Sequence, residues 1–459
     1  RELNERDAAV KHYKKALRNK QDFVEAYNNL GVTFQELGQQ DAAVKSYEKA
    51  LIIKPDYAEA YFNLGNSLMS IGQLCVAAEN FEKALMIEPN YTEAHNNLGV
   101  ALNNLAHMEK AIESYLNAIK FKPDYANAHN NLGSVFNDLG RWEEALESYS
   151  KALEYNPEHN EAYENLIKLL TFYKPKKANS NLIVIANQEL QNIKYNYNPN
   201  TKITDNEISN FFKKCNKIIL KNKNKISFNR SQIYRRNTID LNCNRHLEVF
   251  NNFNAIPEYC FGCYKVQVEP KTIIELFKLY FVFDQLQLPQ NNSRKCLVEL
   301  RPEISGTYKG LVYCFNLNEA NEIFIILKNI LKNTINDEIQ IKIRRGCSEF
   351  AISYPDYKEI NQNGDQLMKY KDKWREKEKI VDEKLLNETQ RKNKKVVKDN
   401  LTGVTLSDVL IMYNWLNYAK AIGDNNYQII SKDILKSNYM ENELSQQLDI
   451  RNKEFSSIH

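Results

Sequence analysis

Two short clusters of metal-ligand residues lie near the middle of this sequence. Cys243 and His246 are separated by two residues, and further along the chain Cys260 and Cys263 repeat that spacing. Thiolates and imidazoles arranged as two such pairs can supply four ligands to a tetrahedral ion, which suits Zn(II) best and an iron–sulfur cluster second. The sequence therefore predicts a candidate zinc site at these four residues. Four protein ligands would leave no open coordination position, so the zinc would be structural.

Other interpretations of these cysteines stay open. Buried, reduced cysteines behave as small apolar side chains, and Gly262 in the second pair suits a tight turn that holds no metal. A third interpretation is a reactive thiol or an iron–sulfur cluster with a redox function. Three more cysteines follow in the same block, at Cys296, Cys314 and Cys347. How these thiols are used depends on the strands and helices that place them.

The residues around the cysteines predict a sheet with two helices. The predicted strands cover residues 264–268, 296–300, 311–315 and 339–343, and the predicted helices cover 273–281 and 323–331. This order, βαββαβ, is typical of a ferredoxin-like split βαβ fold. Right-handed crossovers would place the third strand antiparallel between the first two. The five cysteines from Cys260 to Cys347 would then lie at one edge of the sheet.

Asparagine recurs at a fixed interval through the first third of the chain. Asn29, Asn63, Asn97, Asn131 and Asn165 are each 34 residues apart. A period of this length is typical of stacked helix pairs that form an interaction surface. A row of amides, which donate and accept hydrogen bonds, can hold an extended peptide backbone. Substitution of three of these asparagines by alanine should therefore weaken peptide binding and have little effect on thermal stability. The alternative is that these asparagines only cap or solvate helices.

Other positions of the 34-residue unit share this period. Each unit carries a Leu-Gly pair, an alanine, an aromatic residue, a second alanine and a closing proline. In the first full unit these residues are Leu30-Gly31, Ala43, Tyr47, Ala50 and Pro55. Glycine and alanine let two antiparallel helices approach closely, the aromatic ring fills the space beside them, and proline ends the second helix. At these positions the chain resembles the tetratricopeptide repeat (TPR) family over about residues 1–175.

The resemblance implies a TPR α-solenoid whose first helices line a concave face. The asparagines fall on those helices, which is similar to the asparagine ladder in the repeats of O-linked N-acetylglucosamine transferases. Acidic residues one turn earlier, such as Glu59, argue against the carboxylate clamp of chaperone-binding members, because they would repel a peptide's terminal carboxylate. We therefore expect a scaffold that holds peptide segments of a protein partner. The alternative is an enzyme whose repeats recruit a protein substrate for modification by the Cys-rich domain.

Composition changes divide the chain into four parts. They are a TPR superhelix (1–175), a basic Asn- and Lys-rich linker and helix (176–240), a Cys-rich ferredoxin-like domain (241–360) and a charged helical tail (361–459). The helix of the second part should begin near Asp205. A last helix should start from a cap at Ser407 and end near Gly423. Only the repeats carry a family resemblance.

Composition and charge also indicate the class of partner. The net charge of +4 on 459 residues is too small to require a nucleic acid or a membrane surface. No stretch approaches the roughly 20 apolar residues of a membrane span. Eight cysteines in so long a chain are not a secreted disulfide framework, so we expect a cytoplasmic protein. Residues 309–315 resemble the third strand of RNA-recognition motifs only faintly, because Leu311 stands where an aromatic residue is expected.

The remaining motifs point to packing rather than catalysis. No P-loop, HExxH motif or Gly-rich nucleotide loop stands in the sequence, so we predict no catalytic residues. His95 and His129 occupy the aromatic position of their repeats and should pack rather than bind metal. The chain opens at Arg1 inside a repeat unit, so we expect that it begins within a longer array. Ile167 in place of the small glycine, followed by Pro175, indicates a terminal cap.

Overall fold

The computed structural model divides the chain into two compact units. One unit comprises Arg1–Leu166 and Glu388–Val396, and the other comprises Ile167–Asn387 and Val397–His459. The residues that the structure describes are 2–195, 197–221, 232–235, 243–300, 304, 306–357, 367–389, 401 and 403–430.

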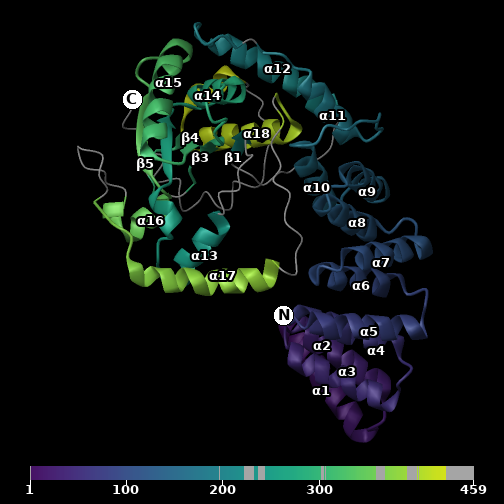
Figure 1. Cartoon of the computed structure of the whole chain (residues 1–459). Helices are drawn as coiled ribbons and strands as arrows, with labels where there is room; N and C mark the ends of the chain where they lie inside the picture. Colours follow the sequence, from purple (N-terminus) through teal and green to yellow (C-terminus); the bar gives the residue numbers. More distant parts are fainter. Residues whose placement is uncertain are drawn as a thin grey trace. The chain divides into compact units, whose positions relative to one another are not determined.

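The first unit is a stack of helix pairs that follows the 34-residue period (Figure 1). Its helices are α1 (Glu2–Asn19), α2 (Val24–Glu36), α3 (Gln40–Ile53), α4 (Ala58–Ser70), α5 (Leu74–Ile87), α6 (Thr92–Asn104), α7 (Met108–Phe121), α8 (Ala126–Asp138), α9 (Trp142–Tyr155) and α10 (Asn160–Leu170). We call the even-numbered helices from α2 to α10 the first helices of their repeats, and α3, α5, α7 and α9 the second helices. From α1 to α9 each helix contacts the next, and α2, α4, α6 and α8 also touch one another in turn. The predicted repeat architecture is confirmed.

A glycine in each first helix faces an aromatic ring of the second helix. A Cβ atom added at Gly31 would lie 2.5 Å from the ring of Tyr47, and one added at Gly99 would lie 2.6 Å from Tyr115. Both rings are almost completely buried. The backbone of the first helix can approach the ring this closely only where no side chain intervenes. The predicted role of the Leu-Gly pair and the aromatic residue is therefore confirmed.

The two repeat histidines pack as predicted. The ring of His95 stacks on Phe121 with 5.5 Å between centroids, and that of His129 lies 5.4 Å from Tyr155. In each histidine Nε2 lies 2.9 Å from the carbonyl oxygen of the proline that closes the preceding repeat. These side chains join one repeat to the next.

The second unit combines a sheet with helices from distant parts of the sequence (Figure 1). Its strands are β1 (Gln232–Arg235), β2 (Tyr264–Glu269), β3 (Arg294–Val298), β4 (Tyr308–Cys314) and β5 (Gln340–Arg345). Its α-helices are α11 (Leu182–Gln191), α12 (Asp205–Lys221), α13 (Cys243–Phe253), α14 (Ile273–Gln285), α15 (Leu317–Thr334), α16 (Ser348–Ser353), α17 (Arg375–Thr389) and α18 (Leu406–Ala421). Short 3-10 helices are η1 (Glu258–Phe261), η2 (Pro355–Tyr357), η3 (Asp372–Trp374) and η4 (Asn425–Ile429).

The described strands form an antiparallel sheet in the order β1-β3-β4-β2-β5. The predicted position of β4 between β2 and β3 is confirmed, and β5 pairs with β2 on its other side. The edge strand β1 was not predicted, and α11, α12 and α18 are additional to a split βαβ unit. The structure thus shows a mixed region with a five-stranded antiparallel sheet, which is a broader class than the ferredoxin-like fold expected from the sequence.

Helices α14 and α15 cover one face of this sheet. Helix α14 contacts β3 and β4, and α15 contacts β2, β4 and β5. The strand side chains Val266, Val268 and Val312 are fully buried there. Since alternate residues of a strand point to opposite faces, Lys265 and Gln267 of β2 belong to the other face.

Helices α11 and α12 belong to the same core, although residues 176–240 were predicted to be a linker with one helix. That helix is confirmed as α12. The ring centroid of its Phe212 lies 4.8 Å from that of Phe277 in α14. Helix α11 was not predicted. Its Asn187 is fully buried and accepts a hydrogen bond from the backbone N–H of Leu406, at the start of α18, at 2.8 Å. These contacts make both helices part of the second unit.

Helix α18 is buried on nearly all sides and does not lie in a charged tail. Trp415 and most other side chains of the helix are inaccessible to solvent, as expected of a helix that is apolar all round. The helix starts at Leu406, and its cap lies two residues before the predicted one. The cap is Thr405, which forms a capping box with Asp408, whereas Ser407 is buried in the first turn. The predicted end of the helix near Gly423 is confirmed.

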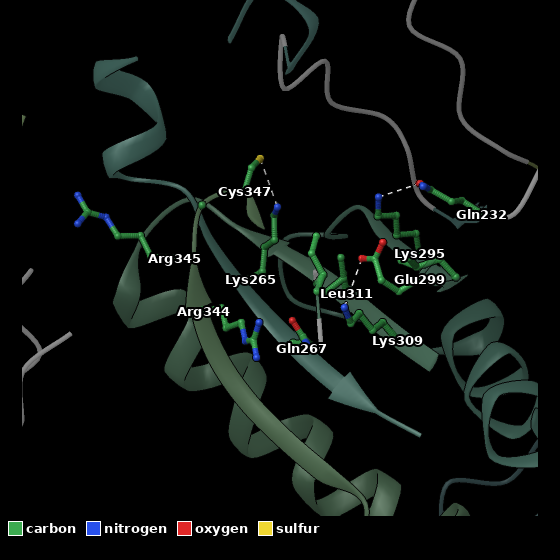
Figure 2. Close-up of a pocket in the computed structure, with 13 residues that line it drawn as sticks. Gln232, Lys265, Gln267, Lys295, Glu299, Lys309, Leu311, Arg344, Arg345 and Cys347 are labelled. Atoms are coloured by element: carbon green, nitrogen blue, oxygen red, sulfur yellow. Dashed lines mark hydrogen bonds and ion pairs between the residues drawn. The ribbon is translucent and has the colours of Figure 1, made fainter. Parts of the chain in front are cut away.

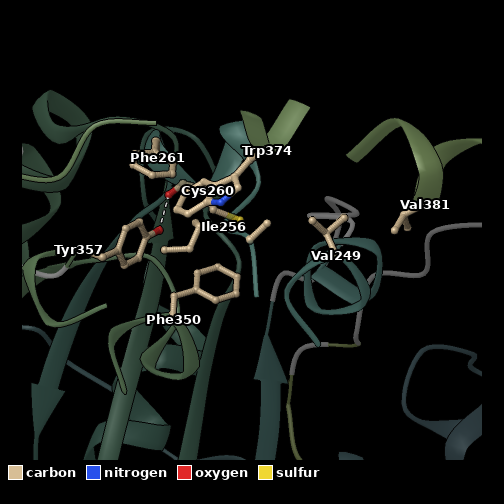
Figure 3. Packing of buried hydrophobic residues seen from close by; sticks show 9 residues of the cluster. Val249, Ile256, Cys260, Phe261, Phe350, Tyr357, Trp374 and Val381 are labelled. Atoms are coloured by element: carbon tan, nitrogen blue, oxygen red, sulfur yellow. Dashed lines mark hydrogen bonds between the residues drawn. The ribbon is translucent and has the colours of Figure 1, made fainter. Parts of the chain in front are cut away.

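A second apolar cluster joins α13, η1, α16, η2 and α17 (Figure 3). Its core includes Phe261, Tyr357 and Trp374, and the hydroxyl of Tyr357 donates to the carbonyl oxygen of Cys260 at 2.6 Å. The predicted charged tail does contain a helix, α17, which begins directly after Trp374 of η3. That helix is anchored through this cluster.

Candidate functional site

Asparagine side chains link the first helices of successive repeats. The bonds run from Nδ2 to Oδ1 at 3.1, 3.0 and 3.1 Å, and they join Asn63 to Asn28, Asn131 to Asn96 and Asn165 to Asn130. The donors are predicted site residues, and we call Asn29, Asn63, Asn97, Asn131 and Asn165 the amide ladder. The buried acceptors were not predicted. They stand directly before ladder residues, so the repeated Asn-Asn pair was the signal that could have found them.

The pattern changes at one rung of the amide ladder. Phe62 occupies the position that Asn28 and Asn96 hold in other repeats, and its ring lies 4.9 Å from that of Tyr91. Asn97 therefore bonds instead to Asn66, one turn further along α4, with 2.7 Å between Nδ2 and Oδ1. A hydrogen bond between these two repeats is therefore still formed, with Asn66 as the acceptor.

The amide ladder retains hydrogen-bonding capacity. An amide has two N–H groups and an oxygen, and the link to the neighbouring repeat uses one N–H. Asn63, Asn97 and Asn131 are half-buried, whereas Asn29 is exposed and its side chain bonds to none of the residues that the structure describes. Asn63, Asn97 and Asn131 are therefore hydrogen-bonded to the neighbouring repeat and still partly accessible to solvent.

One carboxylate beside the amide ladder is hydrogen-bonded to the asparagines. Glu59 accepts hydrogen bonds from Nδ2 of Asn28 at one oxygen and from the hydroxyl of Tyr57 at the other, both at 3.1 Å. Burial raises the pKa of Tyr57 to about 12, and the Glu59 carboxylate adds to the effect. Burial and the same carboxylate also raise the pKa of Tyr91 to about 12. The first helices thus present a surface of amides with a negative field.

Three of the four predicted metal ligands line one small cavity in the second unit. His246 of α13, Cys260 of η1 and Cys263 surround a space of about 10 Å³ together with Cys347, which was not in the predicted ligand set. Cys243 begins α13, but its side chain lies outside the described residues. Among the described residues no group of three or more His, Cys, Asp or Glu is placed to hold a metal ion. The zinc site therefore stays a prediction.

The predicted gathering of cysteines at one sheet edge is found for four of the five. Cys263 and Cys314 line a common cavity, since Cys314 is the register partner of the residue after Cys263. Burial raises the pKa of Cys314 to about 12, so this thiol stays protonated at neutral pH. Cys296 lies within the sheet instead, opposite Gly310 and Ile233.

A cation-rich pocket of about 90 Å³ lies on the face of the sheet opposite α14 and α15 (Figure 2). Lys265, Lys295 and Lys309 line it, and the nearly buried Lys309 pairs with Glu299 at 3.3 Å. The ammonium of Lys265 lies 3.5 Å from the sulfur of Cys347. The sequence signal that hints at this pocket is the alternation of Lys265 and Gln267 with apolar residues in β2.

Comparisons with known proteins assign the first unit. Family models described as TPR repeat and tetratricopeptide repeat match residues 1–38, 34–72, 58–91, 108–137 and 126–159. No curated protein matches the chain. The N-terminal part of this protein is therefore an array of tetratricopeptide repeats, which indicates a protein-interaction scaffold. Among the helices that the structure describes, none is both long and apolar enough to cross a membrane.

Several solved structures are similar to about a third of the chain. MamA is 29% identical, with a TM-score of 0.33 over 34% of this chain and 92% of that chain. YrrB, described as a TPR protein with an unusual peptide-binding site, is 27% identical, with a TM-score of 0.32 over 35% of this chain and 83% of that one. A thermophilic TPR protein of Thermus thermophilus, TTC0263, is 24% identical, with a TM-score of 0.32 over 37% and 92%.

Proposed function

We propose that this protein is a scaffold that holds an extended peptide segment of a partner along the first helices of its repeats. The amide ladder carries the proposal, because Asn63, Asn97 and Asn131 are oriented by their neighbours and remain half-exposed. Side chains that are already ordered lose less entropy when they bind a ligand. The resemblance of the repeats to those of O-linked N-acetylglucosamine transferases is one of the reasons for this proposal.

Amides suit a ligand whose sequence varies. An extended peptide exposes an N–H donor and a C=O acceptor at each residue, and a side-chain amide can bond to both. Such contacts supply affinity through the main chain and leave specificity to neighbouring side chains. The regular spacing of the ladder would extend this grip over several residues of the partner.

The structure predicts that mutation of the amide ladder lowers the stability of the fold. Alanine at Asn63 would leave the oxygen of Asn28, a residue only 1% exposed, without its donor. Loss of a partner by a buried polar group costs roughly 1–3 kcal/mol. The expectation that such substitutions leave stability unchanged is therefore not supported, and the test of function needs a control with a similar defect.

The test combines a peptide library with matched variants. Short linear peptides displayed on phage are selected on the full chain, and their affinities are then measured for the variant N63A/N97A/N131A. We expect at least about a tenfold loss, since each lost hydrogen bond contributes about 1 kcal/mol. Asn80→Ala is the control, because this buried amide donates to the Val76 carbonyl oxygen at 2.7 Å within a second helix. Peptides that bind the triple variant as tightly as the wild type would overturn the proposal.

A further inference from the structure

Charge is distributed unevenly between the two kinds of helix in the repeats. Helices α2, α4, α6 and α8 contain no lysine or arginine, whereas each of the second helices (α3, α5, α7 and α9) contains at least one lysine. The acidic residues of these four first helices are Glu25, Glu36, Glu59, Glu93 and Asp138. The face that carries the amide ladder is therefore acidic.

The most regular of these charges form a row beside the amide ladder. Glu25, Glu59, Glu93 and Glu161 each precede a ladder asparagine by four residues, and we call them the acidic row. Residues four apart on a helix lie on the same face, so the row and the ladder are neighbours. All four side chains are exposed, and Asn127 takes the corresponding position in α8.

The acidic row forms no direct ion pair with the residues that the structure describes around it, and a nearby cation, the ammonium of Lys54, lies 5.2 Å from the ring centroid of Tyr57. None of its four members forms an ion pair with a described lysine or arginine, whereas Glu36 at the far end of α2 pairs with Arg6 at 3.1 Å. The negative field reaches the neighbouring phenols, since Glu59 and Glu93 both add to the burial that raises the pKa of Tyr91. A ligand on this face would meet that field.

We infer that the partner segment held on this face is basic, an extended stretch that carries lysine or arginine side chains. The inference rests on the proposed function, because the amide ladder holds the backbone while the acidic row selects the side chains. A row of like charges attracts oppositely charged segments and repels acidic ones. Acidic segments and segments that present a terminal carboxylate are accordingly disfavoured.

The expected selectivity follows from the exposure of the row. An ion pair between exposed groups changes the affinity roughly two- to fivefold, so three such contacts together should give at least about tenfold. The preference should weaken as salt is added, because the Debye length falls from about 10 Å at 0.1 M to about 3 Å at 1 M.

Three labelled peptides test the inference on the full chain. One carries alternating lysine and serine, and the other two carry glutamine or glutamate in place of every lysine. Fluorescence anisotropy should show the lysine peptide binding at least about tenfold more tightly than the glutamine peptide, with no binding of the glutamate peptide. The gap between the lysine and glutamine peptides should close at high salt.

Two sets of variants locate the selectivity. In E25Q/E59Q/E93Q the amide oxygen at position 59 can still accept the bond from Asn28, and the amide nitrogen can donate to the hydroxyl of Tyr57, so the preference for lysine should disappear while the glutamine peptide binds as before. The control replaces three exposed glutamates of the second helices that have the same 34-residue spacing, Glu79, Glu113 and Glu147. The control set should keep the preference.

The outcomes separate this inference from the function on which it rests. If the lysine and glutamine peptides bind equally and both depend on the amide ladder, the scaffold proposal stands and the basic preference is wrong. If the preference survives E25Q/E59Q/E93Q, or is lost in the second-helix set, the acidic row is not its cause. Self-association of the chain that depends on the acidic row would identify a second copy as the occupant and overturn the inference.

Discussion

Single hydrogen bonds orient the side chains that the repeats offer to a partner. Asn28 accepts a bond from Asn63 of the amide ladder and donates one to Glu59 of the acidic row. Because Asn28 is buried, its amide has one favourable orientation, and the donor and acceptor positions of its two neighbours follow from it. The orientation of an exposed amide and an exposed carboxylate thus depends on one buried residue.

The coupling between carboxylate and phenols can be measured directly. Glu59→Gln should lower the pKa values of both Tyr57 and Tyr91, which burial, with a contribution from Glu59, raises to about 12. NMR of 13C-labelled tyrosine rings across alkaline pH would show both titrations move down, whereas Glu79→Gln should leave them in place. Unchanged titrations in Glu59→Gln would contradict the described contacts.

The sign of the accompanying stability change follows from linkage. A raised phenol pKa means that the folded chain retains protons which the unfolded chain releases above the ordinary value of 10.0. The stabilisation is complete below that pH and is lost as the pH rises toward 12. Denaturant midpoints should therefore fall over this range.

The zinc prediction is decided by elemental analysis of the full chain from a reducing host. With Cys243, His246, Cys260 and Cys263 as ligands, about one zinc ion per chain is expected, and acid should release it because the thiols must be deprotonated. Cys260→Ser should lose the ion, whereas Cys347→Ser should keep it. Because Cys347 lines the same cavity, loss in Cys347→Ser would show that the predicted ligand set is wrong. Absence of both zinc and iron would leave reduced thiols as the interpretation.

At the scale of elements, helix α17 is held to α13 by charge as well as by apolar contacts. Arg245 donates to Glu378 at 2.6 Å and makes two bonds of 2.7 Å with Asp382. The side chains of Arg245 and Glu378 are only 11% and 12% exposed, so each has lost most of its hydrogen bonds to water, and the bond between them replaces part of that loss. The Arg245 guanidinium also lowers the pKa of Asp382.

Removal of this arginine should loosen α17. Arg245→Met leaves two carboxylates without their partner, which should cost about 3 kcal/mol and raise amide hydrogen exchange along the helix. The matched control is Lys384→Met, which breaks the more exposed pair with Glu248 and should cost under about 1 kcal/mol. Equal exchange in the two variants would show that charge does not hold the helix.

At the scale of the molecule, the second unit is assembled from segments far apart in the chain. Asp424, after α18, accepts hydrogen bonds from the backbone N–H of Ile273 at 2.7 Å and from the hydroxyl of Tyr308 at 2.8 Å. Tyr413 of α18 donates to Asn216 of α12. A domain boundary at residue 361 would separate these partners, so the unit extends from the end of the repeats to at least residue 430.

Features that recur at a fixed interval along the chain could be predicted from the sequence. The 34-residue repeat, the glycine that faces an aromatic ring and the two-residue alternation of β2 each report a local face of a helix or strand. The amide ladder was located in this way, because its members recur on one face of successive helices. The order of the four predicted strands followed from the handedness of crossovers, which is a general property of chains of L-residues.

The remaining features depend on which surfaces meet, and only the tertiary structure decided them. The bond from Asn63 to Asn28 joins residues 35 positions apart, and the contact of Asn187 with Leu406 spans 219. No local period records such pairs, because they form only when packing brings distant segments together and repays the entropy of closing the chain between them. For the same reason the sequence determined that the N-terminal part of this protein is a TPR array with an asparagine-lined face, while the structure decided how those amides are oriented and which helices complete the second unit.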